Sequence, residues 1–86
     1  MNTTKYLDLF ISETSEHIKL LNDNLLVLEK NPDNAEAINQ SFRSFHTIKG
    51  MAATMGYDPL ANLAHRAEDI LSEIRTVSYT HLRAHE

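Results

Sequence analysis

Apolar side chains recur every three or four residues along most of this chain, and this spacing limits its fold more than any other feature. The first such stretch runs from about Thr4 to Glu29 and stops before Asn31-Pro32. Two glycines and two prolines in 86 residues are too few for the many turns of an all-β protein. The chain is therefore predicted to be all-α. The apolar face of the first helix is Leu7, Phe10, Ile18, Leu21, Leu25 and Leu28, with Thr14 and His17 on the same side.

Two further amphipathic helices are predicted. Asp33 or Asn34 can cap the second, because a short side-chain oxygen accepts a hydrogen bond from an exposed backbone N–H. Gly56 is suited to end it, and Asp58-Pro59 is typical of the start of the third. Short connections predict an antiparallel, up-down helical bundle. The two apolar faces are Ala35, Ile38, Phe42, Phe45 and Ala52, and then Leu60, Leu63, Ala67, Ile70, Leu71 and Ile74.

The helical pattern ends after Arg75. Residues 76–86 carry no apolar stripe and resemble a recurring read-through peptide of assembled sequence fragments, so we expect a helical domain over residues 1–75 and a foreign tail beyond it. Four helices would bury the apolar faces far better than three. We therefore expect a four-helix bundle that is truncated here to about three helices, with apolar surface exposed on the first and third.

Composition and charge exclude several classes of function. The net charge of −4, without a basic stripe, argues against a nucleic-acid partner. With no cysteine there is neither a disulfide nor a thiolate metal site. No apolar run approaches the roughly 18 residues that span a bilayer, and no signal pattern is present, which predicts a cytoplasmic protein. The chain also lacks a glycine-rich phosphate loop, so it is not expected to bind ATP by itself.

The segment from Phe42 to Gly56 carries the residues with the clearest chemical role. His46, Lys49 and Gly50 lie within one helical turn and share a surface. Glycine inside a helix costs about 1 kcal/mol relative to alanine. Gly50 therefore indicates a need for room, for a phosphoryl group or for an approaching partner. A neutral imidazole beside a fixed ammonium suits the acceptance of a phosphoryl group.

The third helix offers complementary groups. His65 and Glu68 form an i, i+3 pair beside the apolar stripe, and antiparallel packing would bring this flank to His46. A carboxylate that accepts a hydrogen bond from Nδ1–H would leave Nε2 unprotonated and nucleophilic. Lys49 would offset charge on the phosphoryl oxygens, and His65 would donate a further hydrogen bond.

Other interpretations of these residues stay open. His46, His65 and Glu68 are three potential metal ligands, but Lys49 would place a second cation beside the metal, and no fourth ligand is evident. We therefore expect no metal site. The chain lacks a hydrolase nucleophile elbow and an inward pair of carboxylates. A helical protein-interaction module without phosphotransfer would also account for the amphipathic helices.

The chain resembles the histidine phosphotransfer (HPt) domains at the N-terminus of bacterial chemotaxis histidine kinases of the CheA type. Phosphotransfer domains in general share the His-x-x-Lys-Gly pattern of His46 to Gly50, and the His-x-x-Glu of His65 to Glu68 is typical of the chemotaxis branch. The resemblance covers about residues 4–75 and is carried by Tyr6–Phe10, Leu28–Pro32, Phe42–Ala52 and Leu63–Leu71.

This resemblance implies a four-helix bundle that works in a two-component relay. His46 would be phosphorylated by the ATP-binding kinase domain of the partner subunit in a CheA dimer. It would pass the phosphoryl group to an aspartate of a CheY- or CheB-type response regulator. The domain would have no autonomous activity and no bound cofactor. An HPt module of a different phosphorelay would keep His46 and change only its partners. The other implied site residues are Glu68 as the partner of His46, Lys49 and His65 in support, Gly50 for access, and Thr47 beside the site.

Overall fold

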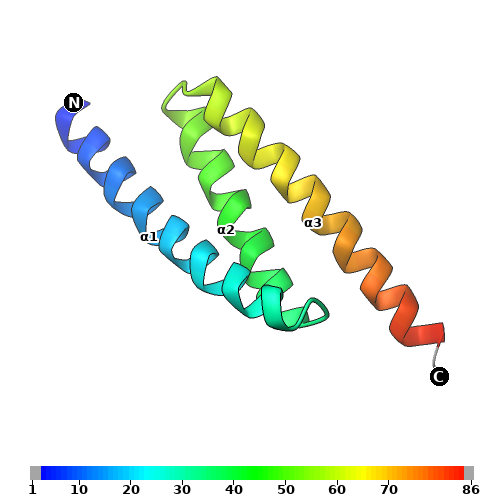
Figure 1. Cartoon of the computed structure of the whole chain (residues 1–86). Helices are drawn as coiled ribbons and strands as arrows, with labels where there is room; N and C mark the ends of the chain where they lie inside the picture. Colours follow the sequence, from blue (N-terminus) through cyan, green and yellow to red (C-terminus); the bar gives the residue numbers. More distant parts are fainter. Residues whose placement is uncertain (1–2, 85–86) are drawn as a thin grey trace.

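The computed structural model describes the backbone of residues 3–84 and the side chains of residues 4–77. Within this part the chain forms three α-helices, α1 (Thr3–Lys30), α2 (Ala35–Thr54) and α3 (Asp58–Ala84). The helices run alternately up and down, joined by short turns (Figure 1). The prediction of an all-α, antiparallel helical arrangement is confirmed.

The turns between the helices follow the local sequence. Asn34, and not Asp33, caps α2: its side-chain oxygen accepts a hydrogen bond from the backbone N–H of Ala37 at 3.0 Å. After α2, Gly56 has a φ of +77°. This is the left-handed region, which glycine adopts without the steric cost that other residues meet. The chain then enters α3 at Asp58, as predicted.

The central helix α2 holds the molecule together. It packs against both α1 and α3, whereas α1 and α3 do not pack against each other within residues 3–84. The helices therefore form a single layer (Figure 1), which measures 55 × 20 × 16 Å. A small core lies across this layer. It consists of Leu21 from α1, Ile48 from α2 and Ala64 from α3, with Phe45, Met51 and Leu60 packed against them.

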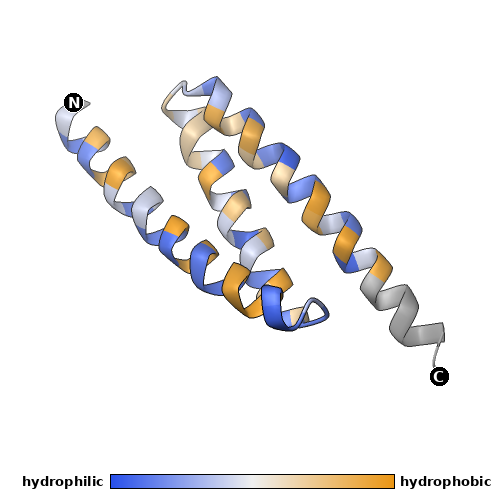
Figure 2. Cartoon of the chain, viewed as in Figure 1, coloured by the Kyte–Doolittle hydropathy of each residue, from blue (hydrophilic) through white to orange (hydrophobic). Residues whose placement is uncertain are grey.

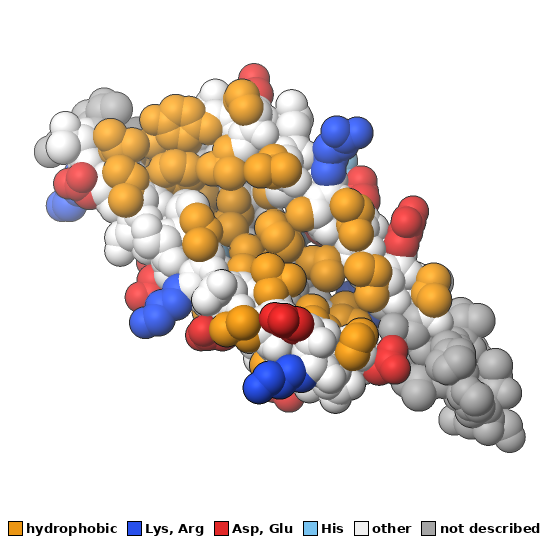
Figure 3. Space-filling model, in the orientation of Figure 1, with side chains coloured by type: hydrophobic (Ala, Val, Ile, Leu, Met, Phe, Trp, Pro, Cys, Tyr) orange, Lys and Arg blue, Asp and Glu red, His pale blue; other side chains and the backbone are white. Residues whose placement is uncertain are grey.

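This single layer leaves much apolar surface exposed, as expected for the first and third helices. Apolar residues occur on all three helices (Figure 2), and apolar side chains gather in a broad band over one face (Figure 3). Each outer helix packs only on α2, so only its narrow side toward α2 is buried. Among the residues of the predicted apolar faces, those that are exposed are Ile18, Leu25, Ala35, Leu63, Ile70 and Ile74.

The buried side of α3 contains a carboxylate. Among its described side chains, those buried are Ala64, Glu68 and Leu71. Glu68 thus lies in the line that is turned inward, and not on the flank where the sequence pattern had suggested it. A buried carboxylate is unfavourable unless it is paired and hydrogen-bonded. Its partners are therefore required by the fold as well as by any chemistry.

Helix α3 continues beyond its apolar stripe. Its backbone stays helical through Arg75 to Ala84. The side chains of residues 78–86, which make up most of the predicted tail, lie outside the described part. The boundary between a domain over 1–75 and a foreign tail over 76–86 stays a prediction. Despite the length of α3, none of the described helices contains an apolar stretch that could cross a membrane.

Candidate functional site

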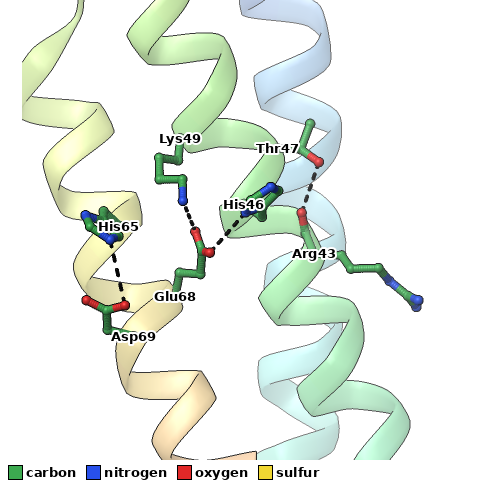
Figure 4. A network of polar contacts seen from close by, with 7 residues as sticks. All are labelled: Arg43, His46, Thr47, Lys49, His65, Glu68 and Asp69. Atoms are coloured by element: carbon green, nitrogen blue, oxygen red, sulfur yellow. Dashed lines mark hydrogen bonds and ion pairs between the residues drawn. The ribbon is translucent and has the colours of Figure 1, made fainter.

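The candidate site lies where α2 faces α3, and one carboxylate links the two helices. Nδ1 of His46 lies 3.0 Å from Oε1 of Glu68, and Nζ of Lys49 lies 2.9 Å from Oε2 of the same residue (Figure 4). Because His46 and Lys49 are three residues apart on a helix, they project from one surface of α2. The structure therefore brings together three of the four predicted site residues.

The charge of Glu68 is set by these two partners. Its side chain is only 11% exposed. Burial by itself would raise the pKa of Glu68, but hydrogen bonds from Lys49 and His46, with the positive charge of Lys49, outweigh it and hold the pKa below its ordinary value. Glu68 is therefore an ionised carboxylate at neutral pH. In that state its oxygens only accept hydrogen bonds.

The ionised carboxylate fixes which nitrogen of His46 carries a proton. Since Glu68 has no proton to donate, Nδ1–H of His46 is the donor in the 3.0 Å contact. In a neutral imidazole the other nitrogen, Nε2, then keeps a free lone pair. The side chain of His46 is 62% exposed. This arrangement presents Nε2 as a nucleophile on a solvent-accessible ring whose Nδ1 is held by Glu68.

His65 lies outside this contact. Its Nε2 lies 3.8 Å from Oδ1 of Asp69, a separation that is an ion pair only when His65 is protonated, and both side chains are largely exposed. Figure 4 shows His65 directed toward Asp69, one turn further along α3. Among the described contacts, none joins His65 to His46 or Glu68. Asp69 was missed, although its i, i+4 spacing from His65 is visible in the sequence.

Thr47 and Gly50 differ in how they adjoin His46. The hydroxyl of Thr47 donates a hydrogen bond to the backbone carbonyl of Arg43 at 3.0 Å, so it is engaged within its own helix. A Cβ at Gly50 would meet no atom within 4 Å. Close packing inside the described chain therefore does not require glycine there. Gly50 lines a groove between α1 and α2, together with Tyr6 and Phe10.

Sequence reasoning missed a second contact of His46. The ring of Phe42 lies nearly parallel to the imidazole, at 12° and with 6.4 Å between the ring centroids. Cζ of Arg75 lies 4.6 Å from the centroid of the Phe42 ring. The i, i+4 spacing of Phe42 and His46 could have indicated the first contact. No local signal indicates the second, because Arg75 comes from α3.

The donor geometry does not favour a metal ion. No group of three His, Cys, Asp or Glu side chains that could hold one occurs in the described part of the chain. The ammonium of Lys49 contacts Oε2 of Glu68, and His65 is directed to Asp69. The predicted alternative of His46, His65 and Glu68 as a ligand set therefore does not form.

Known proteins are similar to this chain in both sequence and fold. The model of the Hpt domain family matches residues 5–84. Chemotaxis protein CheA of Listeria monocytogenes is 56% identical over 73 residues, which are 85% of this chain and 12% of the relative. Chemotaxis protein CheA of Bacillus subtilis is 48% identical over 75 residues, or 87% of this chain and 11% of the relative. The chain thus spans only a small part of the length of these relatives.

The solved CheA phosphotransferase domain from Thermotoga maritima superimposes with a TM-score of 0.85 at 48% identity, covering 90% of this chain and 73% of that one. The backbone agreement with this solved domain confirms the helical arrangement. The family model matches nearly every residue of the chain. The resemblance to the phosphotransfer domain of CheA-type kinases is confirmed, and this chain belongs to the Hpt domain family.

Proposed function

We propose that this chain is a histidine phosphotransfer module of a chemotaxis two-component system, with Nε2 of His46 as the atom that accepts and donates the phosphoryl group. The observation that carries this proposal is the 3.0 Å contact between Nδ1 of His46 and Oε1 of Glu68. It holds the proton on Nδ1 and leaves the Nε2 lone pair free. The Hpt family match supports the same conclusion.

In the first step the Nε2 lone pair attacks the γ-phosphorus of ATP held by a separate kinase domain. The N–P bond forms, the bond from phosphorus to the β–γ bridging oxygen breaks, and ADP leaves with that electron pair. The imidazole keeps its proton on Nδ1 and becomes positively charged. The carboxylate of Glu68 stabilises this charge more than it stabilises the neutral ring, which favours the transfer.

In the second step the phosphoryl group passes to a carboxylate oxygen of an aspartate on a response regulator. A P–O bond forms, the N–P bond breaks, and the electron pair returns to Nε2. The ring is neutral again and its proton has not moved. A histidine that keeps one protonation pattern through both directions suits a carrier of phosphoryl groups.

Lys49 has two roles in this proposal. Its ammonium, 2.9 Å from Oε2, holds Glu68 in place, and its positive charge lies one helical turn from His46, where it offsets charge on incoming phosphoryl oxygens. We assign His65 a smaller part, because it is paired with Asp69. Substitution of Lys49 or of His65 can separate their contributions from the acceptor role of His46.

The partners in this proposal are a CheA-type kinase domain, as the source of the phosphoryl group from ATP, and response regulators of the CheY or CheB type. The chain itself binds no cofactor in this scheme and has no autonomous activity. Regulator identity and a cytoplasmic location stay predictions.

The test is phosphorylation of this chain by a separate CheA-type kinase core with labelled ATP. The parent, His46→Gln and His65→Gln are compared, the last being a matched control because it removes an exposed histidine near the site. We expect acid-labile, alkali-stable label on the parent and on His65→Gln, and none on His46→Gln. Label on His46→Gln would mean that another residue accepts the phosphoryl group. No label on a folded parent chain would favour a plain interaction module.

A further inference from the structure

The imidazole of His46 is held on more than one side. Glu68 fixes Nδ1 through a hydrogen bond, and the Phe42 ring lies parallel to the imidazole at 12° with 6.4 Å between centroids. This separation is within the range of stacked aromatic pairs, which runs from about 4.5 to 7 Å. Because 62% of the His46 side chain is exposed, surrounding packing restrains the ring little. The Phe42 ring is thus a neighbour that lies parallel to this exposed imidazole.

Phe42 is in turn held by α3. Cζ of Arg75 lies 4.6 Å from the centroid of the Phe42 ring, within cation–π distance. One terminal nitrogen of Arg75 donates a hydrogen bond to Oδ1 of Asn39 at 3.4 Å. Asn39 and Phe42 are three residues apart on α2, so the guanidinium spans one surface of that helix. The planar guanidinium suits both contacts at once.

These contacts form a continuous column in the order Arg75, Phe42 and His46. The two ends come from different helices, and the same two helices are linked again by Glu68 through His46 and Lys49. Movement of α3 relative to α2 would therefore disturb both restraints on the imidazole together.

We propose that Phe42 is a positioning residue for phosphoryl transfer, and that Arg75 acts through it. The column keeps Nδ1 directed at Glu68 and Nε2 directed outward before a partner arrives. In this proposal Phe42 and Arg75 act on the orientation of His46 and do not themselves bind the phosphoryl group. This inference rests on the proposed function for its effect on rate, but the orientation of the ring is a property of the unphosphorylated chain and can be measured without any partner.

The test uses Phe42→Leu, Arg75→Gln and the double variant, with Phe45→Leu as the matched control. Phe45 is the neighbouring phenylalanine on α2, but it packs against the core. The first measurement is the ring nitrogen chemical shifts of His46 by NMR, which report its tautomer. We expect Phe42→Leu to shift them toward a mixture of tautomers and Arg75→Gln to move them less in the same direction. Phe45→Leu should lower stability and leave them unchanged.

The second measurement is the rate of labelling by the kinase core. We expect Phe42→Leu to slow it about five- to tenfold, less than the ~100-fold that a misplacement of about 1 Å can cost. If Arg75 acts through Phe42, the double variant should be no slower than Phe42→Leu, because the effects are coupled. Additive effects would assign Arg75 an independent role and overturn that part of the proposal.

Two other results would overturn the positioning role itself. One is an unchanged set of His46 shifts in Phe42→Leu and in Arg75→Gln. The latter changes an exposed side chain, so it tests the column without disturbing the core. The other is an equal shift in Phe45→Leu, which would reflect general loosening of α2. If the parent chain is not labelled at all, the proposed function fails, whereas the chemical shifts still decide the orientation of the ring.

Discussion

Replacing Glu68 with glutamine isolates the part that its charge plays. Glutamine has nearly the same shape, and its amide oxygen can still accept a hydrogen bond from Nδ1–H of His46. The negative charge is lost, however, and it faces two partners, Nδ1 of His46 at 3.0 Å and Nζ of Lys49 at 2.9 Å. Since transfer to Nε2 leaves the ring positively charged, the missing charge should weaken the phosphorylated state more than the neutral one.

The size of the effect follows from the two kinds of hydrogen bond. A bond to a charged group contributes about 1.5–3 kcal/mol, against about 0.5–1.5 kcal/mol for a neutral pair. The difference of about 1–1.5 kcal/mol corresponds to a rate about five- to thirteenfold lower. At the 3.0 Å contact distance and an effective dielectric constant of 20, the Coulomb energy of two unit charges is about 5–6 kcal/mol, which is an upper bound. Solvent screens the interaction here because the His46 side chain is 62% exposed.

The assay is single-turnover labelling by a separate kinase core, with the parent, Glu68→Gln and Glu73→Gln compared. Glu73 is an exposed acid on the same helix, so its replacement alters the net charge equally without touching the site. We expect the slower rate only for Glu68→Gln, with the helical content unchanged by circular dichroism. Equal labelling rates for a folded Glu68→Gln and the parent would refute the reasoning from charge.

Three further predictions concern stability. The pKa of Glu68 is lower in the folded chain than its unfolded value of about 4.3. Ionisation of Glu68 therefore stabilises the fold fully above the unfolded pKa. This contribution is lost as the pH falls through the folded pKa. Acid titration of the unfolding free energy should therefore be less steep in Glu68→Gln, and an equal slope would contradict the pairing. Gly50→Ala should raise the unfolding free energy by about 0.5–1 kcal/mol, because the added Cβ enters open space. If a partner uses that space, the same substitution should slow labelling. Thermal melts measure the first effect and labelling rates the second. Asn34→Ala should lower the stability of the chain by about 1 kcal/mol through loss of the cap, whereas Asp33→Ala should not, as urea titration can establish.

Much of the fold was predictable because helix geometry is local. The spacing of apolar residues, the Asn34 cap and Gly56 at the second turn depend on neighbours within a few positions. For the same reason the sequence alone places His46 and Lys49 on one surface. The burial of individual apolar residues was less predictable. Ile18 and Ile70 follow the helical period and still stay exposed, because period does not reveal how many neighbours a helix has.

The site divides in the same way. Sequence by itself placed His46, Lys49 and Gly50 within one helical turn, since a single helix carries all three. Only the tertiary structure decided that Glu68 is buried between α2 and α3 and is held ionised by both partners. It also decided that His65 turns to Asp69 and that Arg75 reaches Phe42. The physical reason is that a pKa and a contact between helices depend on distances and burial, which arise only when separate parts of the chain pack together.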